Sequence, residues 1–285
     1  MPKLSFFPLG NADCTRIDLD DGRKILFNYT DRRDPNAEDD LLCDLPKELR
    51  DDLDQQDKDF FDVVAFTHLD KDHYEKASEF FYLEHAEKYQ DGERIKIREL
   101  WVPAAVITES GVEDIEARII QGEARYRLKQ GKGIRVFSRP LRLKAWLEQQ
   151  GLRLEDRMYL ITDAGKLIPG FSKSGVERVE FFVHSPFAKR LDDGTLEDRN
   201  DDALVVQATF LCDGREPKVI LAADVTHDVI VDFVGVTRSR NNESRLEWDV
   251  FKLPHHCSYC SLGPEKGEDL TVPVDEVAWL FEQQG

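Results

Sequence analysis

Two histidines and two aspartates stand close together in one short segment of the chain, Thr67-His68-Leu69-Asp70-Lys71-Asp72-His73. Imidazole nitrogens and carboxylate oxygens are ligands of Zn²⁺, Mn²⁺ and Fe in proteins. Two adjacent metals can hold a bridging hydroxide that is nucleophilic at neutral pH. The segment therefore predicts a metal centre. The alternative interpretation is a polar loop that has these residue types by chance, because short patterns recur in unrelated sequences.

The segment follows residues 60–67, a mostly apolar and partly β-branched run that is typical of a buried strand. In an extended exit from this strand, His68 and Asp70 point to the same side because side chains alternate with a period of two. Asp72 and His73 stand where the next helix should begin. We expect all four side chains to face one small volume.

Three later segments place further ligand-type residues at the ends of expected strands. His184 ends residues 179–184, Asp224 follows residues 219–223, and His255 and His256 follow residues 250–253. Sheets of α/β proteins build their sites at the carboxyl ends of strands. For His184 the alternative is a histidine that only caps a strand.

A His-x-Asp-x-Asp-His motif followed by His, Asp and His at strand ends resembles the metallo-β-lactamase superfamily, in the variant whose second motif histidine is an aspartate. The chain is most similar to the ComEC-type hydrolase domain of DNA-uptake proteins. The resemblance covers most of residues 4–261, and its further segments are Leu9-Gly10-Asn11-Ala12-Asp13-Cys14, His184-Ser185-Pro186, Asn200-Asp201-Asp202-Ala203, Ala223-Asp224 and His255-His256-Cys257-Ser258.

The chain departs from the family pattern at several positions. Asn28-Tyr29-Thr30-Asp31 stands where the family usually has Asp-Gly-Gly, Cys257 replaces a glycine, and Ala203 replaces a serine. Only residues 262–285 follow Ser261, whereas the family adds further strands that close its second sheet. We therefore expect a truncated end or a protein partner that covers this edge.

The resemblance implies two divalent metal ions, Zn or Mn, and a division of the ligands between them. The residues implied for the first ion are His68, Asp70 and His184. Those implied for the second are Asp72, His73 and His255, with Asp224 bridging. His255 is preferred to His256 as the ligand, and the other histidine would support a ligand or donate a proton. Asp72 or Asp70 would orient the nucleophile.

Strands and helices alternate along the chain, which indicates a layered α/β architecture. The resemblance implies one domain over residues 1–285, a four-layer αββα sandwich of two mixed sheets with a short C-terminal end. Residues 4–28 predict a meander of strands, residues 74–89 an amphipathic helix, and residues 274–284 a helix. Residues about 107–175 are expected to form a helical insertion over the active site.

A basic cluster lies within residues 125–145, although the formal net charge of the chain is −18. The cluster is either a solvated face or a surface that follows a phosphate backbone. The candidate substrate-binding residues are Arg125, Arg127, Lys129, Lys132 and Asn200. The chain has no apolar run of membrane-spanning length and no signal-peptide pattern, so we expect a cytoplasmic protein without a membrane partner.

The leading functional prediction is a phosphodiesterase or nuclease that uses a metal-bridging hydroxide, with nucleic acid or a nucleotide as substrate. One alternative is a hydrolase of small esters, thioesters or lactones, which would have a closed apolar pocket. The other is a non-catalytic subunit that keeps the fold and binds a protein partner at its C-terminal edge. Fold alone does not decide among them.

Overall fold

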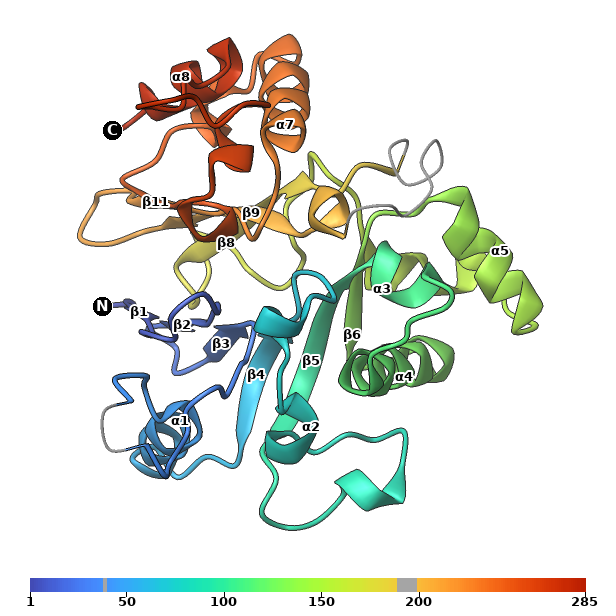
Figure 1. Cartoon of the computed structure of the whole chain (residues 1–285). Coiled ribbons are helices and arrows are strands. Elements are labelled where there is room, and N and C mark those ends of the chain that lie inside the picture. Colours follow the sequence, from blue (N-terminus) through green and yellow to red (C-terminus); the bar gives the residue numbers. More distant parts are fainter. Residues whose placement is uncertain (38–39, 189–198) are drawn as a thin grey trace. The chain divides into compact units, whose positions relative to one another are not determined.

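The computed structural model describes residues 1–37, 40–188 and 199–285, and these form two compact units. The N-terminal unit contains Pro2–Val136 and Arg142–Ile161. The C-terminal unit contains Met1, Phe137–Leu141 and Thr162–Gly285. The described residues form one mixed sheet of seven strands and one of four. Helices lie between the strands along the chain (Figure 1). The predicted mixed α/β class is confirmed.

The N-terminal unit begins with an antiparallel meander. Strands β1 (Lys3–Phe6), β2 (Thr15–Asp18) and β3 (Lys24–Phe27) pair in sequence order, and a turn at Gly22 joins the last two. Gly22 has a φ of 85°, a backbone conformation that glycine adopts without steric cost. The predicted meander is confirmed.

The sheet continues with two parallel strands, β4 (Phe60–Ala65) beside β3 and β5 (Lys96–Pro103) beside β4. Helix α1 (Leu45–Asp54) lies between β3 and β4 in the sequence. The Asp44 carboxylate caps this helix by accepting a hydrogen bond from the Lys47 backbone N–H. Because β3, β4 and β5 are parallel, their carboxyl ends lie at one edge of the sheet.

Residues 107–175 contain strands as well as helices. Helix α3 (Ala104–Thr108) leads into α4 (Ile115–Gln130), and α5 (Leu141–Gln149) follows later. Between and after them, β6 (Ile134–Phe137) and β7 (Ile161–Thr162) extend the sheet beyond β5. The predicted helical insertion therefore also supplies the last two strands of the first sheet.

The prediction of one helix over residues 74–89 is wrong. Only α2 (Ala77–Phe80) and a short 3₁₀ turn, Glu87–Tyr89, are helical. Phe81 leaves the helix because its backbone forms a bridge with Ile95, and its ring packs against Tyr29 at a centroid distance of 5.3 Å. Tertiary packing of the aromatic residues overrides the helical spacing of the apolar residues here.

The sheet of the C-terminal unit has the order β11-β10-β9-β8. Strands β8 (Val179–Ser185), β9 (Val205–Phe210) and β10 (Lys218–Leu221) are antiparallel, and β11 (Val250–Lys252) runs parallel to β10. The strands predicted at residues 179–184, 219–223 and 250–253 are confirmed. The ends of β10 and β11 therefore meet at one edge of this sheet.

Helices α7 (His227–Ser239) and α8 (Asp275–Phe281) lie side by side in the C-terminal unit (Figure 1). They build its apolar core, whose buried residues include Val229, Phe233, Leu246, Val277 and Leu280. Helix α8 falls within the predicted helix at residues 274–284. Among the described helices, none is long and apolar enough to cross a membrane.

Helix α4 contains a buried ion pair, and its arginine also reaches strand β5. The Glu123 carboxylate accepts hydrogen bonds from Arg127 Nε at 2.6 Å and from the His85 backbone N–H at 2.9 Å. Arg127 Nη1 donates to the Ile97 carbonyl at 3.0 Å. Burial opposes the ionisation of Glu123, but hydrogen bonds from His85 and the charge of Arg127 hold its pKa below the ordinary value. Both charges are thus compensated inside the protein.

Removing one partner of this pair should destabilise the fold. We expect Glu123→Ala to lower the free energy of unfolding by about 3 kcal/mol, because the buried Arg127 would lose its hydrogen-bonded carboxylate and keep only Glu84, whose Oε1 lies 3.4 Å from its Nη2. Urea unfolding followed by circular dichroism measures this change. The control is Glu148→Ala, which removes an exposed partner of Lys144 and should change stability little. Equal stability of the two variants would contradict the account.

Candidate metal centre

The motif predicted from the sequence forms a compact turn after β4. His68 and His73 are both buried, and their ring centroids lie 4.0 Å apart. Asp70 is extended, with φ −101° and ψ 145°, and the 3₁₀ turn Lys71–His73 follows it. An extended exit followed by a helical turn is what the spacing predicts, and it brings His73 back beside His68.

Each histidine of this turn has a carboxylate nearby. His68 Nε2 lies 3.8 Å from Asp70 Oδ2, and His73 Nε2 lies 3.9 Å from Asp72 Oδ2. Two ligands of a tetrahedral zinc ion, each bonded at about 2.1 Å, are about 3.4 Å apart. The separations are within several tenths of an ångström of that value. The residue types and their spacing therefore fit a divalent metal.

The side chain of Asn28 connects this turn to the neighbouring strand end. Asn28 follows β3, has a φ of 60°, and is fully buried. Its Oδ1 accepts hydrogen bonds from Thr67 N at 2.9 Å and Thr67 Oγ1 at 3.1 Å. Its Nδ2 lies 3.2 Å from Asp13 Oδ2 and 2.8 Å from His73 Nδ1. Sequence reasoning noted Asn28 only as a departure, although its place at the end of a parallel neighbour of β4 signals this role.

Further backbone contacts fix the turn that carries Asp72 and His73. The Asp72 carbonyl accepts hydrogen bonds from Thr30 Oγ1 at 2.6 Å and from the Asp13 N–H at 3.2 Å. The His73 carbonyl accepts one from the Tyr29 N–H at 3.1 Å. These hydrogen bonds fix the backbone of the turn. Sequence reasoning did not identify Thr30 or Asp13 as supports of the site.

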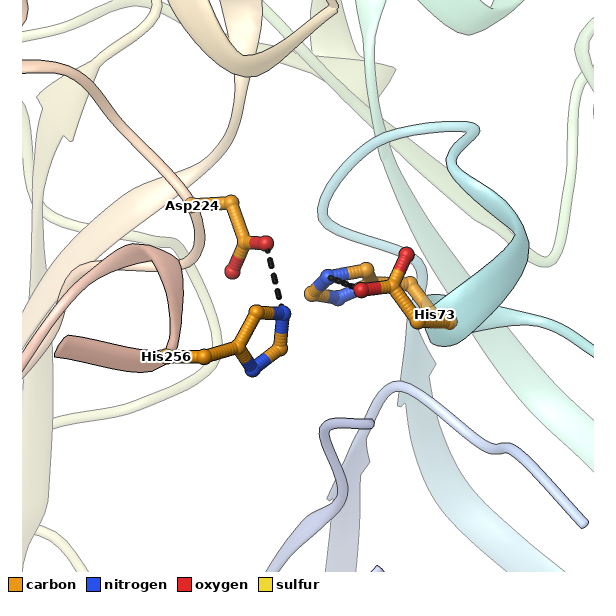
Figure 2. A group of neighbouring side chains, drawn as sticks. His73, Asp224 and His256 are labelled. Carbon is orange, nitrogen blue, oxygen red and sulfur yellow. Dashed lines mark ion pairs between the residues drawn. The ribbon is translucent and has the colours of Figure 1, made fainter. Parts of the chain in front are cut away.

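The C-terminal unit contributes a second set of ligand-type residues. Asp224 follows β10, and its Oδ2 lies 2.9 Å from His256 Nε2, as the dashed line between them shows in Figure 2. The His255 backbone N–H donates to the Ala223 carbonyl at 3.1 Å. The sequence favoured His255 over His256 as the metal ligand, and nothing in the contacts of the two rings tests that preference. The structure places His256 against Asp224.

The loops that carry this second set have unusual backbone conformations. His255, His256 and Cys257 have φ values of 49°, 51° and 64°, and Ala223 has a φ of 48°. Left-handed conformations are uncommon for residues with a β-carbon, and they concentrate at functional sites. The backbone around Asp224 and His256 therefore has conformations that glycine adopts more readily than the residues present.

His184 is packed against the helix-covered side of its sheet. Its ring lies 5.0 Å from the rings of Phe182 and Phe233, and it is buried. Its Nε2 donates to the Arg245 carbonyl at 2.9 Å, because a carbonyl only accepts. Burial lowers the pKa of His184 to about 4. With its proton on Nε2 the ring keeps the lone pair of its buried Nδ1, an arrangement that suits a structural histidine and the predicted metal ligand equally.

The predicted basic surface is interrupted because two of its arginines have other partners. Arg127 is buried in the pair with Glu123. Arg125 is partly buried, and its guanidinium donates to the Ile107 and Glu109 carbonyls at 2.8 Å and 3.0 Å. The prediction that these two arginines bind substrate is therefore corrected. Lys129 and Lys132 are exposed.

Asn200 lies in the same unit as Asp224. The turn that contains Asn200 is bound to the loop that follows Asp224. Asn200–Asp202 forms a 3₁₀ turn, and Asp201 Oδ1 accepts a hydrogen bond from Thr226 Oγ1 at 2.8 Å. Thr226 is two residues beyond Asp224. The predicted substrate-binding Asn200 is thus positioned by a contact close to the second ligand set.

Comparison with known protein families and with curated proteins finds no match for this chain. The function is therefore inferred from the chemistry of the two sets of residues and from the order of their motifs.

Burial of His184 should make stability depend on pH. Its folded pKa of about 4 is below the unfolded value of 6.5, so the unfolded chain binds a proton first as the pH falls. Lowering the pH from 7 to 5 should therefore lower the free energy of unfolding by about 2 kcal/mol. Urea unfolding of the wild type and His184→Gln at both pH values isolates the effect. The same pH dependence in the two proteins would contradict it.

Proposed function

We propose that this protein is a metal-dependent hydrolase of the metallo-β-lactamase type that cleaves phosphodiesters. The observation that carries the proposal is the turn after β4, where two histidines and two aspartates lie together and hydrogen bonds fix the backbone. The proposal includes the finer fold, an αββα sandwich. It is supported by the two mixed sheets and by ligand-type residues at strand ends in both units.

In this proposal the two sets of residues provide ligands for two divalent ions, Zn or Mn. The set from the N-terminal unit offers His68, Asp70, Asp72 and His73. The set from the C-terminal unit offers Asp224 with His256 or His255. That the sets act together rests on the order of the motifs along the chain and on the ligand chemistry of each set. When bound, the ions lower the pKa of a water molecule and neutralise charge on phosphoryl oxygens.

The residues of the chain then supply proton transfer and orientation. A water oxygen forms the new bond to phosphorus while the bond to the leaving oxygen breaks. The carboxylate of Asp72 or Asp70 orients the water and accepts its proton. Where His255 is the metal ligand, His256, whose side chain is 20 % exposed and lies against Asp224, is the proposed proton donor to the leaving oxygen.

The substrate proposed is a short phosphodiester such as a nucleotide or an oligonucleotide. A long polyanion requires many cationic contacts, and each phosphate that is neutralised strengthens binding by releasing counterions. Arg125 and Arg127 are committed to contacts inside the protein, and the net charge of the chain is −18. Lys129 and Lys132 are exposed, but they lie at the end of α4 and before β6, so few cations are available for a long polyanion.

The test is hydrolysis of bis(p-nitrophenyl) phosphate by protein loaded with Mn²⁺ or Zn²⁺. We expect metal-dependent cleavage, and we expect Asp72→Asn to lower kcat/KM by about 100-fold or more because the water loses its carboxylate. The control is Asp228→Asn, an exposed aspartate beside His227 that should leave the activity unchanged.

Other substrates separate the alternatives in the same assay. Cleavage of p-nitrophenyl acetate or a lactone without cleavage of the phosphodiester would replace the proposal with a small-molecule ester hydrolase. Absence of any metal-dependent cleavage, with stable capture of a protein partner, would favour a binding subunit.

A further inference from the structure

We propose that the single amide of Asn28 gives the two adjacent histidines opposite tautomers. His68 then presents the lone pair of Nε2, and His73 presents a proton on Nε2. His68 is therefore the metal ligand of this pair, and His73 is a hydrogen-bond donor to an anionic oxygen of the substrate. The tautomers follow from the protein alone, whereas the two roles rest on the proposed function.

The orientation of the Asn28 amide is fixed by its neighbours. The Thr67 backbone N–H can only donate, and it lies 2.9 Å from Asn28 Oδ1. The Asp13 carboxylate accepts, and it lies 3.2 Å from Asn28 Nδ2. A flipped amide would place a donor against the Thr67 N–H and an acceptor against the carboxylate. Asn28 therefore directs its NH₂ group toward Asp13 and His73.

This orientation decides the tautomer of His73. Asn28 Nδ2 lies 2.8 Å from His73 Nδ1, and an amide NH₂ group donates but does not accept. His73 Nδ1 must then be the acceptor. In the neutral imidazole the proton is on Nε2, where it prevents that nitrogen from binding a metal. Metal ligation through Nε2 would need a proton on Nδ1, facing the NH₂ group of Asn28.

The same amide also decides the tautomer of His68, by way of the Thr67 hydroxyl. Here the proton is placed on Nδ1 instead of Nε2. Asn28 Oδ1 only accepts, so Thr67 Oγ1 donates its single proton to it at 3.1 Å. His68 Nδ1 lies 3.1 Å from the same hydroxyl oxygen and therefore donates to it. The neutral ring of His68 then has its lone pair on Nε2. This is the state in which a histidine ligates a metal while its other nitrogen donates to a fixed acceptor.

The two rings thus offer a lone pair and a proton within one small volume. Their centroids are 4.0 Å apart, so a phosphoryl oxygen near a metal on His68 would be close to the Nε2–H of His73. The sequence prediction that His73 is a second metal ligand is replaced by this donor role. His73 has this role because residue 28 is an asparagine, whose NH₂ group donates to His73 Nδ1. A carboxylate at this position would instead accept a hydrogen bond from a protonated Nδ1.

An exchange of two side chains reverses the arrangement without changing the charge of the protein. In the double variant Asp13→Asn, Asn28→Asp, one oxygen at position 28 still accepts from Thr67. The other oxygen can accept from the new amide at position 13 and from His73 Nδ1–H. The matched control exchanges Asp34 and Asn36, which hydrogen-bond to each other on an exposed loop.

The tautomers are read directly by ¹⁵N NMR of histidine-labelled, metal-free protein, at a pH about two units above the ordinary histidine pKa of about 6.5. The variants His68→Gln and His73→Gln assign the signals. In the wild type and the loop-exchange control we expect protonated Nδ1 for His68 and protonated Nε2 for His73. In the site-exchange variant we expect the His73 proton to move to Nδ1. A wild-type His73 with its proton on Nδ1 would overturn the proposal.

Zinc titration tests the roles that follow. We expect His68→Gln to weaken zinc binding by at least about tenfold and His73→Gln to leave it nearly unchanged, whereas the site exchange should strengthen binding by about 10-fold to 100-fold. Equal losses in the two histidine variants would overturn the assignment of roles. If no variant binds zinc but the NMR result is as expected, the proposed function fails and the tautomers stand.

Discussion

The hydrogen bonds of Asn28 are the interaction on which the N-terminal site depends. The Asn28 backbone N–H donates to the Ala65 carbonyl at 2.7 Å and continues the pairing of β3 with β4. Its side chain then reaches Thr67 and His73, one on each side of the ligand turn. One buried residue thus sets both the path of the backbone and the protonation pattern of the rings. A buried amide whose hydrogen bonds are all satisfied is costly to disturb, because each lost partner leaves a polar group without water.

Parallel strand pairing brings Asn28 and Thr67 together at the end of β3 and β4. The C-terminal unit has a parallel pair of strands with the same effect. In the N-terminal unit, parallel β3 and β4 place Asn28 beside Thr67. In the C-terminal unit, parallel β10 and β11 place His255 beside Ala223, which precedes Asp224. Segments distant in sequence become neighbours at the carboxyl ends of such strands, where the backbone leaves the sheet and side chains can converge. The motifs are separated in sequence because each belongs to a different strand.

Several strands and the motif after β4 were predictable from the sequence. The predictions that were wrong have physical causes in tertiary packing. The strands at residues 60–67 and 219–223 are buried on both faces, and continuous apolar runs predict them well. The helix at residues 74–89 failed because Phe80 and Phe81 pack on Tyr29, a contact that local spacing does not show. Arg127 looked like a surface cation because its partner Glu123 is on the preceding turn of a helix whose burial the sequence does not reveal. The tautomers of His68 and His73 depend on atoms from three segments, so no local pattern contains them.

The central claim is that the turn after β4 binds a divalent metal, and metal content measures it most directly. Wild-type protein, His68→Ala with Asp70→Ala, and a control with His227→Ala and Asp228→Ala would be loaded with Zn²⁺, desalted and measured by mass spectrometry of the metal. The account predicts stoichiometric zinc in the wild type and the control, and its loss in the variant of the turn. A wild type without bound zinc, or a turn variant that retains all of it, would contradict the account.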